Sequence, residues 1–290
     1  IHCGLVGSEM CIRDRIDPAK QAAEPAFNLG RDLFEGLTVQ DKQGKTIPGI
    51  AESWQANDNN TVYTFTLRQS QWSNGDSLTA HDFVYSWQRL IDPKTASPYA
   101  WFAAIPGIKN SAKIMKGEAP ANTLGVRAID EHTFEVTLEK PVPFFIKLLS
   151  HPVLAPVHQA TVEKYASEWT QPKNIVTNGA FTVSEWKVNE KMVMTKNEKY
   201  WDADNVILDQ ITWLPIGDAN VALNRYLAGE IDQALSIPAA QKNKLLKQYP
   251  EQVADTSASL GSTFYYLNTS KGPTKDLRVR QALSLSLIHI

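Results

Sequence analysis

The side chains in this 290-residue chain that could do chemistry are its histidines and its carboxylate pairs. Asp130 and Glu131 fall at an expected turn, where a solvated pair is the ordinary interpretation, and a glycosidase-type acid pair stays open. There is no Gly-x-Ser-x-Gly motif and no phosphate-binding glycine loop in the sequence. Four histidines within the body of the chain lack the spacing of a metal site: His81, His132, His151 and His158. The sequence therefore predicts no metal, no cofactor and no catalytic nucleophile.

Aromatic residues are the other chemical resource, because the chain has 8 Trp and 9 Tyr. Each of them can pack in a core, or can line a binding cleft, where an aromatic ring gives large contact area at low entropic cost. The formal net charge of −2 gives no electrostatic basis for binding nucleic acid or an anionic membrane. No apolar run approaches the roughly 20 residues that a membrane-spanning helix needs.

The elements that position these residues alternate between helix and strand. Residues 61–68 alternate strictly and predict a half-buried strand, with Tyr63, Phe65 and Leu67 on one face. Thr79 is the expected N-cap of a helix over 80–91, with Phe83, Val84, Trp87 and Leu90 on its buried side. Hairpins are expected over 126–138 and 180–196, strands at 208–214, 231–234 and 263–268, and a helix over 278–284. This order predicts a mixed α/β or α+β fold, and its lack of a clean internal boundary is typical of a discontinuous domain.

The two ends of the chain are related through the genetic code. Codons for residues 9–14 (EMCIRD) can be written so that the reverse complement of the same DNA encodes residues 285–290 (LSLIHI). A short element of this kind resembles a transposase-type sequencing adapter. We therefore expect residues 1–15 and 285–290 to be an adapter-derived scar, outside any fold reasoning. On this hypothesis a signal peptide lies upstream of the chain, and the natural sequence continues beyond residue 284.

Several ordered motifs carry a resemblance to a known family. They are residues 49–54 (GIAESW), 63–68 (YTFTLR), 72–75 (WSNG), 80–89 (AHDFVYSWQR), 92–100 (DPKTASPYA), 169–172 (WTQP), 174–180 (NIVTNGA), 229–232 (GEID) and 276–283 (DLRVRQAL). Their order and spacing resemble the family 5 solute-binding proteins, the receptors of oligopeptide and dipeptide ABC importers. The resemblance covers essentially all of residues 16–284.

The resemblance implies a two-lobed fold of the periplasmic-binding-protein type II, with a small inserted domain, that closes over its ligand by a hinge. Lobe one would comprise residues 16–34 and 159–260, and the inserted domain residues 35–158. Lobe two would begin at residues 261–284, so the chain would stop before most of it. The family's anchor for the peptide α-ammonium would then lie downstream of this chain.

The resemblance also implies which residues touch the ligand. Tyr99 matches a family tyrosine that reaches the bound peptide from the inserted domain. Ala22, Ala23 and Glu24 align with a loop whose backbone pairs with the peptide. Alanine stands at position 22, where oligopeptide receptors of the family often carry an acid, which puts one polar contact in doubt. Lobe two would contribute a run of aromatic cleft residues: Phe264, Tyr265 and Tyr266.

The function implied is a periplasmic receptor, not an enzyme, that captures extended oligopeptides and delivers them to the permease subunits of an ABC transporter. It would act as a monomer and bind no nucleic acid. A family 5 receptor for another solute remains open: murein peptide, dipeptide, nickel chelate or haem. A secreted carbohydrate-active enzyme that uses the Trp-rich surface is the alternative from a different class.

Overall fold

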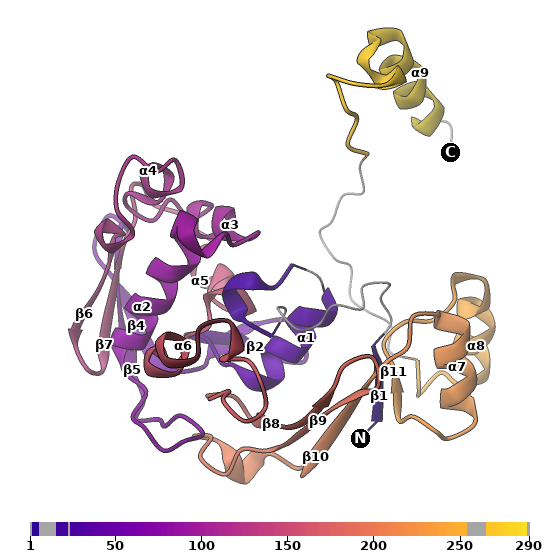
Figure 1. The fold of residues 1–290 in the computed structure, drawn as a ribbon, viewed down its shortest axis with the longest axis horizontal. Helices are drawn as coiled ribbons and strands as arrows, with labels where there is room; N and C mark the ends of the chain where they lie inside the picture. Colours follow the sequence, from indigo (N-terminus) through magenta and orange to yellow (C-terminus); the bar gives the residue numbers. More distant parts are fainter. Residues whose placement is uncertain (1, 6–15, 23, 254–264, 289–290) are drawn as a thin grey trace. The chain divides into compact units, whose positions relative to one another are not determined.

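Two compact units make up the protein in the computed structural model, which describes residues 2–5, 16–22, 24–253 and 265–288. The first unit is Ile1–Ala239 and the second is Ala240–Ile290. Figure 1 shows the elements in order along the chain. The lobe and insert boundaries expected from the sequence stay a prediction.

A five-stranded sheet in the first unit has the strand order β11-β1-β10-β9-β8. β8, β9 and β10 pair antiparallel, whereas β1 lies parallel between β10 and β11. The strands are β1 (His2–Leu5), β8 (Phe181–Lys187), β9 (Lys191–Lys196), β10 (Gln210–Pro215) and β11 (Gln233–Ala234). Residues 2–5, which were expected to lie outside the fold, thus supply a strand. This pairing does not test whether an adapter encodes them.

A four-stranded antiparallel sheet has the order β4-β5-β7-β6, and the helix α2 packs against β6 and β7. Its strands are β4 (Ala51–Ala56), β5 (Val62–Leu67), β6 (Val126–Asp130) and β7 (Thr133–Thr137), and a separate hairpin joins β2 (Thr38–Gln40) to β3 (Thr46–Pro48). Tyr63, Phe65 and Leu67 are all buried. The alternation in this strand therefore predicted its buried face correctly.

Helices cover these sheets or connect their strands. The α-helices of the first unit are α1 (Glu24–Leu33), α2 (Ala80–Ile91), α3 (Ala100–Ala104), α4 (Ser111–Met115), α5 (Phe145–Leu148), α6 (Gln159–Tyr165) and α7 (Ala219–Leu227). The second unit contains α8 (Lys242–Gln248) and α9 (Leu277–Ile288). Short 3-10 turns are η2 (Pro18–Lys20), η3 (Pro93–Thr95), η4 (Ala121–Thr123), η5 (Pro152–Leu154), η6 (Ala166–Glu168), η7 (Ala203–Asn205), η8 (Ala239–Gln241) and η9 (Pro273–Lys275). Within the described ranges, no helix is long and apolar enough to cross a membrane.

The helix α2 begins where the sequence predicts. Asp82 accepts a hydrogen bond from the backbone N–H of Thr79 at 2.8 Å, which completes a capping box at the helix start. Phe83 and Trp87 are fully buried against the sheet. Val84 is only partly buried, but it packs against the same core, so the predicted buried face is confirmed.

Two expectations near the C-terminus were wrong. Of the strand expected over 263–268, residues 263–264 lie outside the described residues, and 265–268 form no strand, because an extended segment needs a partner strand to be stable. The helix expected to stop at residue 284 continues to Ile288. Leucine is a good helix former, so the sequence beyond 284 propagates the helix.

The C-terminal end of α1 is fixed by the buried carboxylate of Glu35. This carboxylate accepts a hydrogen bond from the Tyr200 hydroxyl and one from Trp201 Nε1 at 2.8 Å. The side-chain amide of Asn178 donates to the Glu35 carbonyl at 2.9 Å, and its oxygen accepts from the Glu35 N–H at 3.2 Å. A Cβ on Gly179 would lie 2.6 Å from the carbonyl carbon of Leu33, so only glycine allows this close approach.

Burial raises the pKa of Asp32, also at this end of α1, to about 7 from its ordinary value of 3.8. Its Oδ2 atom is buried and lacks a hydrogen-bond partner. The Trp213 indole lies nearby, but its geometry falls short of a hydrogen bond. Together with the positive charge of Arg31, it lowers the pKa of Asp32 by less than burial raises it. The folded protein therefore holds a proton that the unfolded chain loses between about pH 4 and 7, so the Asp32 contribution to stability falls as pH rises through this window.

We predict that Asp32→Asn flattens the dependence of the unfolding free energy on pH between 4 and 7. Asparagine cannot ionise, so the variant avoids the cost of burying a charge, which is on the order of 1.4 kcal/mol for each tenfold change in the proton affinity of the carboxylate. Urea denaturation at several pH values measures this slope. Asp58→Asn, at an exposed position, is the control and should leave the slope as in the wild type. A slope unchanged by Asp32→Asn would contradict the assignment.

Candidate functional site

The segment Ala22–Glu24 leads directly into α1. Ala22 and Glu24 are exposed, and Ala23 lies outside the described residues. Because alanine side chains offer no polar group, any polar recognition by positions 22 and 23 must come from the backbone. The position of this segment is therefore decided by the residues on either side of it.

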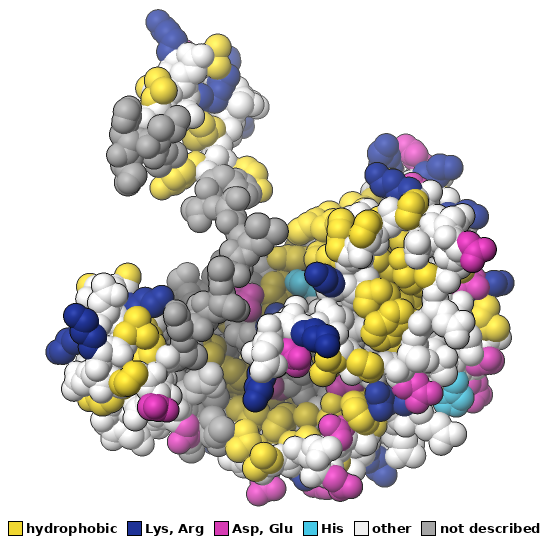
Figure 2. Space-filling model, turned by 180° about the vertical axis from the view of Figure 1, so that it is seen from behind, with side chains coloured by type: hydrophobic (Ala, Val, Ile, Leu, Met, Phe, Trp, Pro, Cys, Tyr) yellow, Lys and Arg dark blue, Asp and Glu magenta, His cyan; other side chains and the backbone are white. Residues whose placement is uncertain are grey.

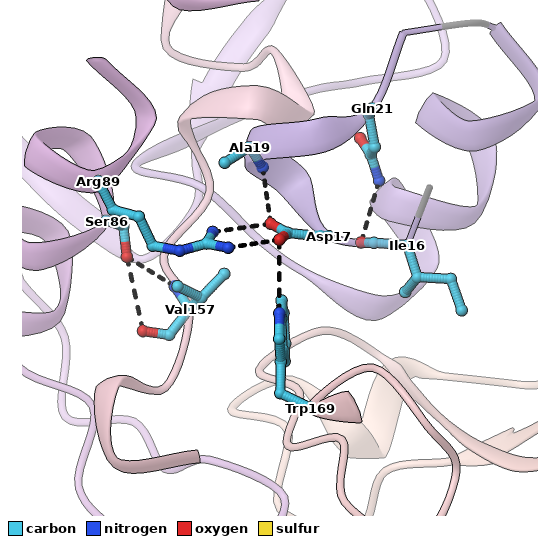
Figure 3. Close-up of polar contacts among 8 residues, drawn as sticks. All are labelled: Ile16, Asp17, Ala19, Gln21, Ser86, Arg89, Val157 and Trp169. Atoms are coloured by element: carbon cyan, nitrogen blue, oxygen red, sulfur yellow. Dashed lines mark hydrogen bonds and ion pairs between the residues drawn. The ribbon is translucent and has the colours of Figure 1, made fainter. Parts of the chain in front are cut away.

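Asp17 fixes the N-terminal side of the segment (Figure 3). Its two carboxylate oxygens accept hydrogen bonds from the Arg89 guanidinium at 2.8 and 2.5 Å. Oδ1 also accepts from the backbone N–H of Ala19 at 3.0 Å, and Oδ2 lies 3.4 Å from Nε1 of Trp169. The Asp17 side chain is 4% exposed and that of Arg89 is 14% exposed, so this is a buried, bidentate ion pair.

Gln21 fixes the same segment from the helix side. It is fully buried, and its amide nitrogen donates to the carbonyl of Ile16 at 3.4 Å. A Cβ on Gly30 would lie 2.4 Å from the Gln21 amide nitrogen, so the side chain rests directly against α1. The chain leading up to Ala22 is thus held in place by buried polar side chains.

The helix α2 anchors this arrangement to the rest of the unit. Besides Arg89, it presents Ser86, whose hydroxyl accepts from the backbone N–H of Val157 at 2.8 Å (Figure 3). Trp87 Nε1 donates to the carbonyl of Leu154 at 2.9 Å. One helix therefore positions both the Asp17 segment and the chain that precedes α6.

Tyr99 lies beside the start of α1, although the two are distant in sequence. Its ring contacts Phe27 edge-on, with 5.2 Å between the ring centroids, and it stacks on His151 at 5.6 Å. Phe27 lies on α1 one turn beyond Glu24. The structure therefore places Tyr99 against α1 through Phe27, three residues beyond Glu24, and the ligand-contact roles of Tyr99 and Ala22–Glu24 stay a prediction.

His151 is the centre of this aromatic cluster. Its ring also contacts Phe27 at 4.8 Å and Phe102 at 4.4 Å, and Nδ1 accepts from the backbone N–H of Val153 at 3.3 Å. Burial, helped by the positive charge of Arg31, lowers the pKa of His151 to about 4. The ring is therefore neutral at physiological pH and acts as a packing histidine.

The remaining three residues expected to contact the ligand lie in the second unit. Phe264 falls outside the described residues. Tyr265 and Tyr266 are 71% and 91% exposed. Their role in binding stays a prediction.

Two observations concern metal binding and catalysis in the described part of the chain. Among the described residues, no group of three His, Cys, Asp or Glu side chains could hold a metal ion. His158 has partners that resemble a catalytic set, with Asp76 Oδ2 at 3.0 Å from Nε2 and Thr161 Oγ1 at 2.7 Å from Nδ1. Thr161 is buried three residues into α6, so this contact stabilises a helix start and offers no accessible nucleophile.

Four residues that position the site were not predicted from the sequence: Asp17, Arg89, Trp169 and Phe27. Asp17 precedes a proline, as an N-cap often does, and this was the one local signal available for it. Its partners lie 72 and 152 residues away, and spacing alone does not reveal contacts of that range.

We predict that Asp17→Ala and Arg89→Ala each lower the free energy of unfolding by about 3–5 kcal/mol, because each leaves a buried charge without its partner. Urea denaturation followed by tryptophan fluorescence measures the loss. Arg127→Ala is the matched control, since Arg127 forms a similar pair with Glu135 but is 67% exposed. That control should change stability little, because water replaces an exposed ion pair. Equal losses in buried and exposed variants would contradict this view of the pair.

Known proteins are similar to this chain in sequence and in fold. The sequence profile described as "Bacterial extracellular solute-binding proteins, family 5 Middle" matches residues 45–287. The periplasmic murein peptide-binding protein MppA of Escherichia coli K12 is 48% identical over 94% of this chain and 50% of its own length. The periplasmic oligopeptide-binding protein OppA of Salmonella typhimurium is 47% identical over 97% of this chain and 51% of its own length.

A solved structure agrees with these relatives. The crystal structure of Haemophilus influenzae OppA in complex with the peptide RPPGFSPFR has a TM-score of 0.88 and 35% identity, and the match covers 98% of this chain and 55% of that one. The chain spans about half the length of the curated relatives it matches. The family match covers most of the chain, and the fold agrees with it. The chain therefore belongs to the family 5 bacterial extracellular solute-binding proteins, whose members are solute-binding receptors.

Proposed function

We propose that this protein is the receptor component of an ABC importer and that it captures extended oligopeptides for delivery to the membrane permease. The observation that carries the proposal is the contact of Tyr99 with Phe27 near the start of α1, where Ala22 and Glu24 are exposed. A backbone segment and an aromatic side chain then face the same ligand. The closely similar relatives are named for binding oligopeptide or murein peptide, which supports a peptide ligand.

The physical logic of the site suits a ligand that is recognised by its main chain. An extended peptide adds to a protein segment as a strand, and its backbone hydrogen bonds are the same for every sequence. Ala22 carries no polar side chain, so it neither selects nor rejects particular ligand residues. Water in roomy side-chain pockets can adapt to different occupants at small cost. This combination gives useful affinity with broad specificity.

A receptor for a single defined solute is the second candidate function. The specific observation in its favour is the 48% identity to a murein peptide-binding protein. A receptor for dipeptides has weaker support, because the dipeptide-binding protein DppE of Bacillus subtilis is 33% identical over 88% of this chain. For a nickel chelate or haem, nothing among the described residues of the site provides a metal-binding set. A carbohydrate-active enzyme is disfavoured, because the family consists of binding receptors.

The setting of this function is the periplasm, the compartment in the names of the similar relatives. We propose that the protein acts there as a monomer, with a peptide and the permease subunits as its partners and without nucleic acid. One bound ligand between two lobes needs no second copy of the chain.

We predict that the protein made from its complete reading frame and purified from its host carries a mixture of peptides. Native mass spectrometry would then show a ladder of bound masses, because backbone recognition does not select one sequence. A single bound mass would favour the murein-peptide alternative. Release of no peptide from a folded protein would contradict both peptide functions.

We also predict that Tyr99→Ala in the complete protein weakens the binding of most peptides by about tenfold, the usual loss when a buried aromatic contact worth about 1.4 kcal/mol is removed. The loss should appear with every peptide, because the ring packs on Phe27, three residues beyond the segment proposed to bond the main chain. Isothermal titration calorimetry measures it. Tyr165→Ala, a half-buried tyrosine on α6, is the control that should leave affinity unchanged. Similar losses in both variants would contradict a contact role for Tyr99.

A further inference from the structure

Trp101 exposes a large apolar surface directly beside the proposed ligand contact. Its side chain is 49% exposed, and its ring centroid lies 5.2 Å from that of Tyr99, with an angle of 37° between the rings. Tyr99 is half-buried, and Phe102, the next residue after Trp101, is buried. Trp101 therefore extends the Tyr99 surface outward by about the width of one aromatic ring.

Ile105 continues this surface along α3. It is 42% exposed and follows Trp101 by four residues in helical conformation, so both side chains lie on the same helix face. Figure 2 shows that hydrophobic side chains also gather on the opposite face of the first unit. We call Tyr99, Trp101 and Ile105 the aromatic shelf. A continuous exposed apolar strip of this kind marks a surface that something else covers.

Contacts on the buried side of the shelf hold it rigid, which suits it to binding a ligand. Tyr99 is held by the edge-on contact with Phe27 and the stack on His151, and Phe102 packs on the same His151 ring. An aromatic side chain has few rotatable bonds, and these contacts leave little freedom to lose when a ligand binds. A ligand group that binds to the shelf therefore loses little of its contact free energy to the ordering of protein side chains.

Charge around the shelf decides which group it accepts. The pKa of His151 is lowered to about 4, so the ring beneath the shelf carries no charge at neutral pH. The Arg31 guanidinium, bonded to Asn28 at 2.8 Å and 3.4 Å from Glu24, is close enough to act on His151. Arg31 is paired with Glu24, so this pair offers little net charge to a ligand, and a charged ligand group on the apolar shelf would lose hydration without an ion-pair partner. The group that fits is neutral and apolar.

We infer that the aromatic shelf is a specificity subsite that accepts a neutral aromatic or large aliphatic side chain of the bound peptide, with Trp101 as its main contact. This inference rests on the proposed peptide-binding function. A peptide whose main chain pairs with Ala22–Glu24 and touches Tyr99 has one side chain within reach of Trp101. Backbone recognition then gives affinity for all peptides, and the shelf adds a preference at one ligand position.

The test is calorimetric titration of the complete protein with Ala-Ala-Ala and with peptides that carry Phe or Lys at each position in turn. The wild type should prefer Phe over Ala at one position and gain nothing from Lys there. Trp101→Ala should weaken binding of that one Phe peptide by about 5–20-fold, the range expected when an aromatic pair and its buried area are lost. Its affinity for Ala-Ala-Ala should stay within about twofold, and Trp101→Phe should restore most of the Phe preference.

Ile129→Ala is the matched control, because Ile129 is also 49% exposed but lies on β6. It should leave every affinity unchanged. Loss of affinity for all peptides alike in Trp101→Ala would show a structural role and overturn the inference, as would an unchanged Phe preference. If the wild type binds none of the peptides, the proposed function itself fails. If instead the wild type binds peptides and Trp101→Ala keeps the preference for Phe, only the inference about the shelf fails.

Discussion

The buried ion pair between Asp17 and Arg89 is the constraint on which the binding surface depends. Removing two charges from water is costly, and the pair recovers this cost only because both carboxylate oxygens are bonded and because Trp169 and Ala19 complete the set. Such a pair adds little net stability compared with apolar residues. It does specify geometry, since almost any other arrangement leaves a charge buried alone. The segment that leads to Ala22 is held by this requirement.

A second buried carboxylate acts at the opposite end of α1. Glu35 follows the helix and is bonded by Tyr200, Trp201 and Asn178, just as Asp17 precedes it and is bonded by Arg89. The helix between them is ten residues long, so both ends are fixed by contacts with distant parts of the chain. Phe27, between these two ends, then has little freedom to move. The ring contact that brings Tyr99 to the ligand segment is a consequence of these two polar anchors.

Local patterns explain how much of this could be predicted from the sequence. The Thr79 cap with Asp82, the alternation from Tyr63 to Leu67, and the two hairpins depend on neighbours within a few residues, and all were predicted correctly. The Asp17–Arg89 pair and the Phe27–Tyr99 contact could not be found this way, because nothing local distinguishes a buried charge from a surface charge. The strand β1 was missed because residues 1–15 were set aside as an adapter-derived scar, so no element was sought there. Tyr99 and Ala22–Glu24 came from the family resemblance, not from any pattern in the chain itself.

The two parts of the proposed site would recognise different features of a ligand, because each lacks a different kind of group. The segment at Ala22 lacks a polar side chain, so it can recognise only what all peptides share. The cluster around His151 lacks charge at neutral pH, so it can distinguish side chains only by apolar surface and shape. Selectivity must therefore come from exposed rings rather than from ion pairs, and Trp101 is the most exposed ring of this cluster, since Tyr99 is half-buried and Phe27 and Phe102 are buried. Under the proposed function, such a site would reject few peptides and prefer some modestly.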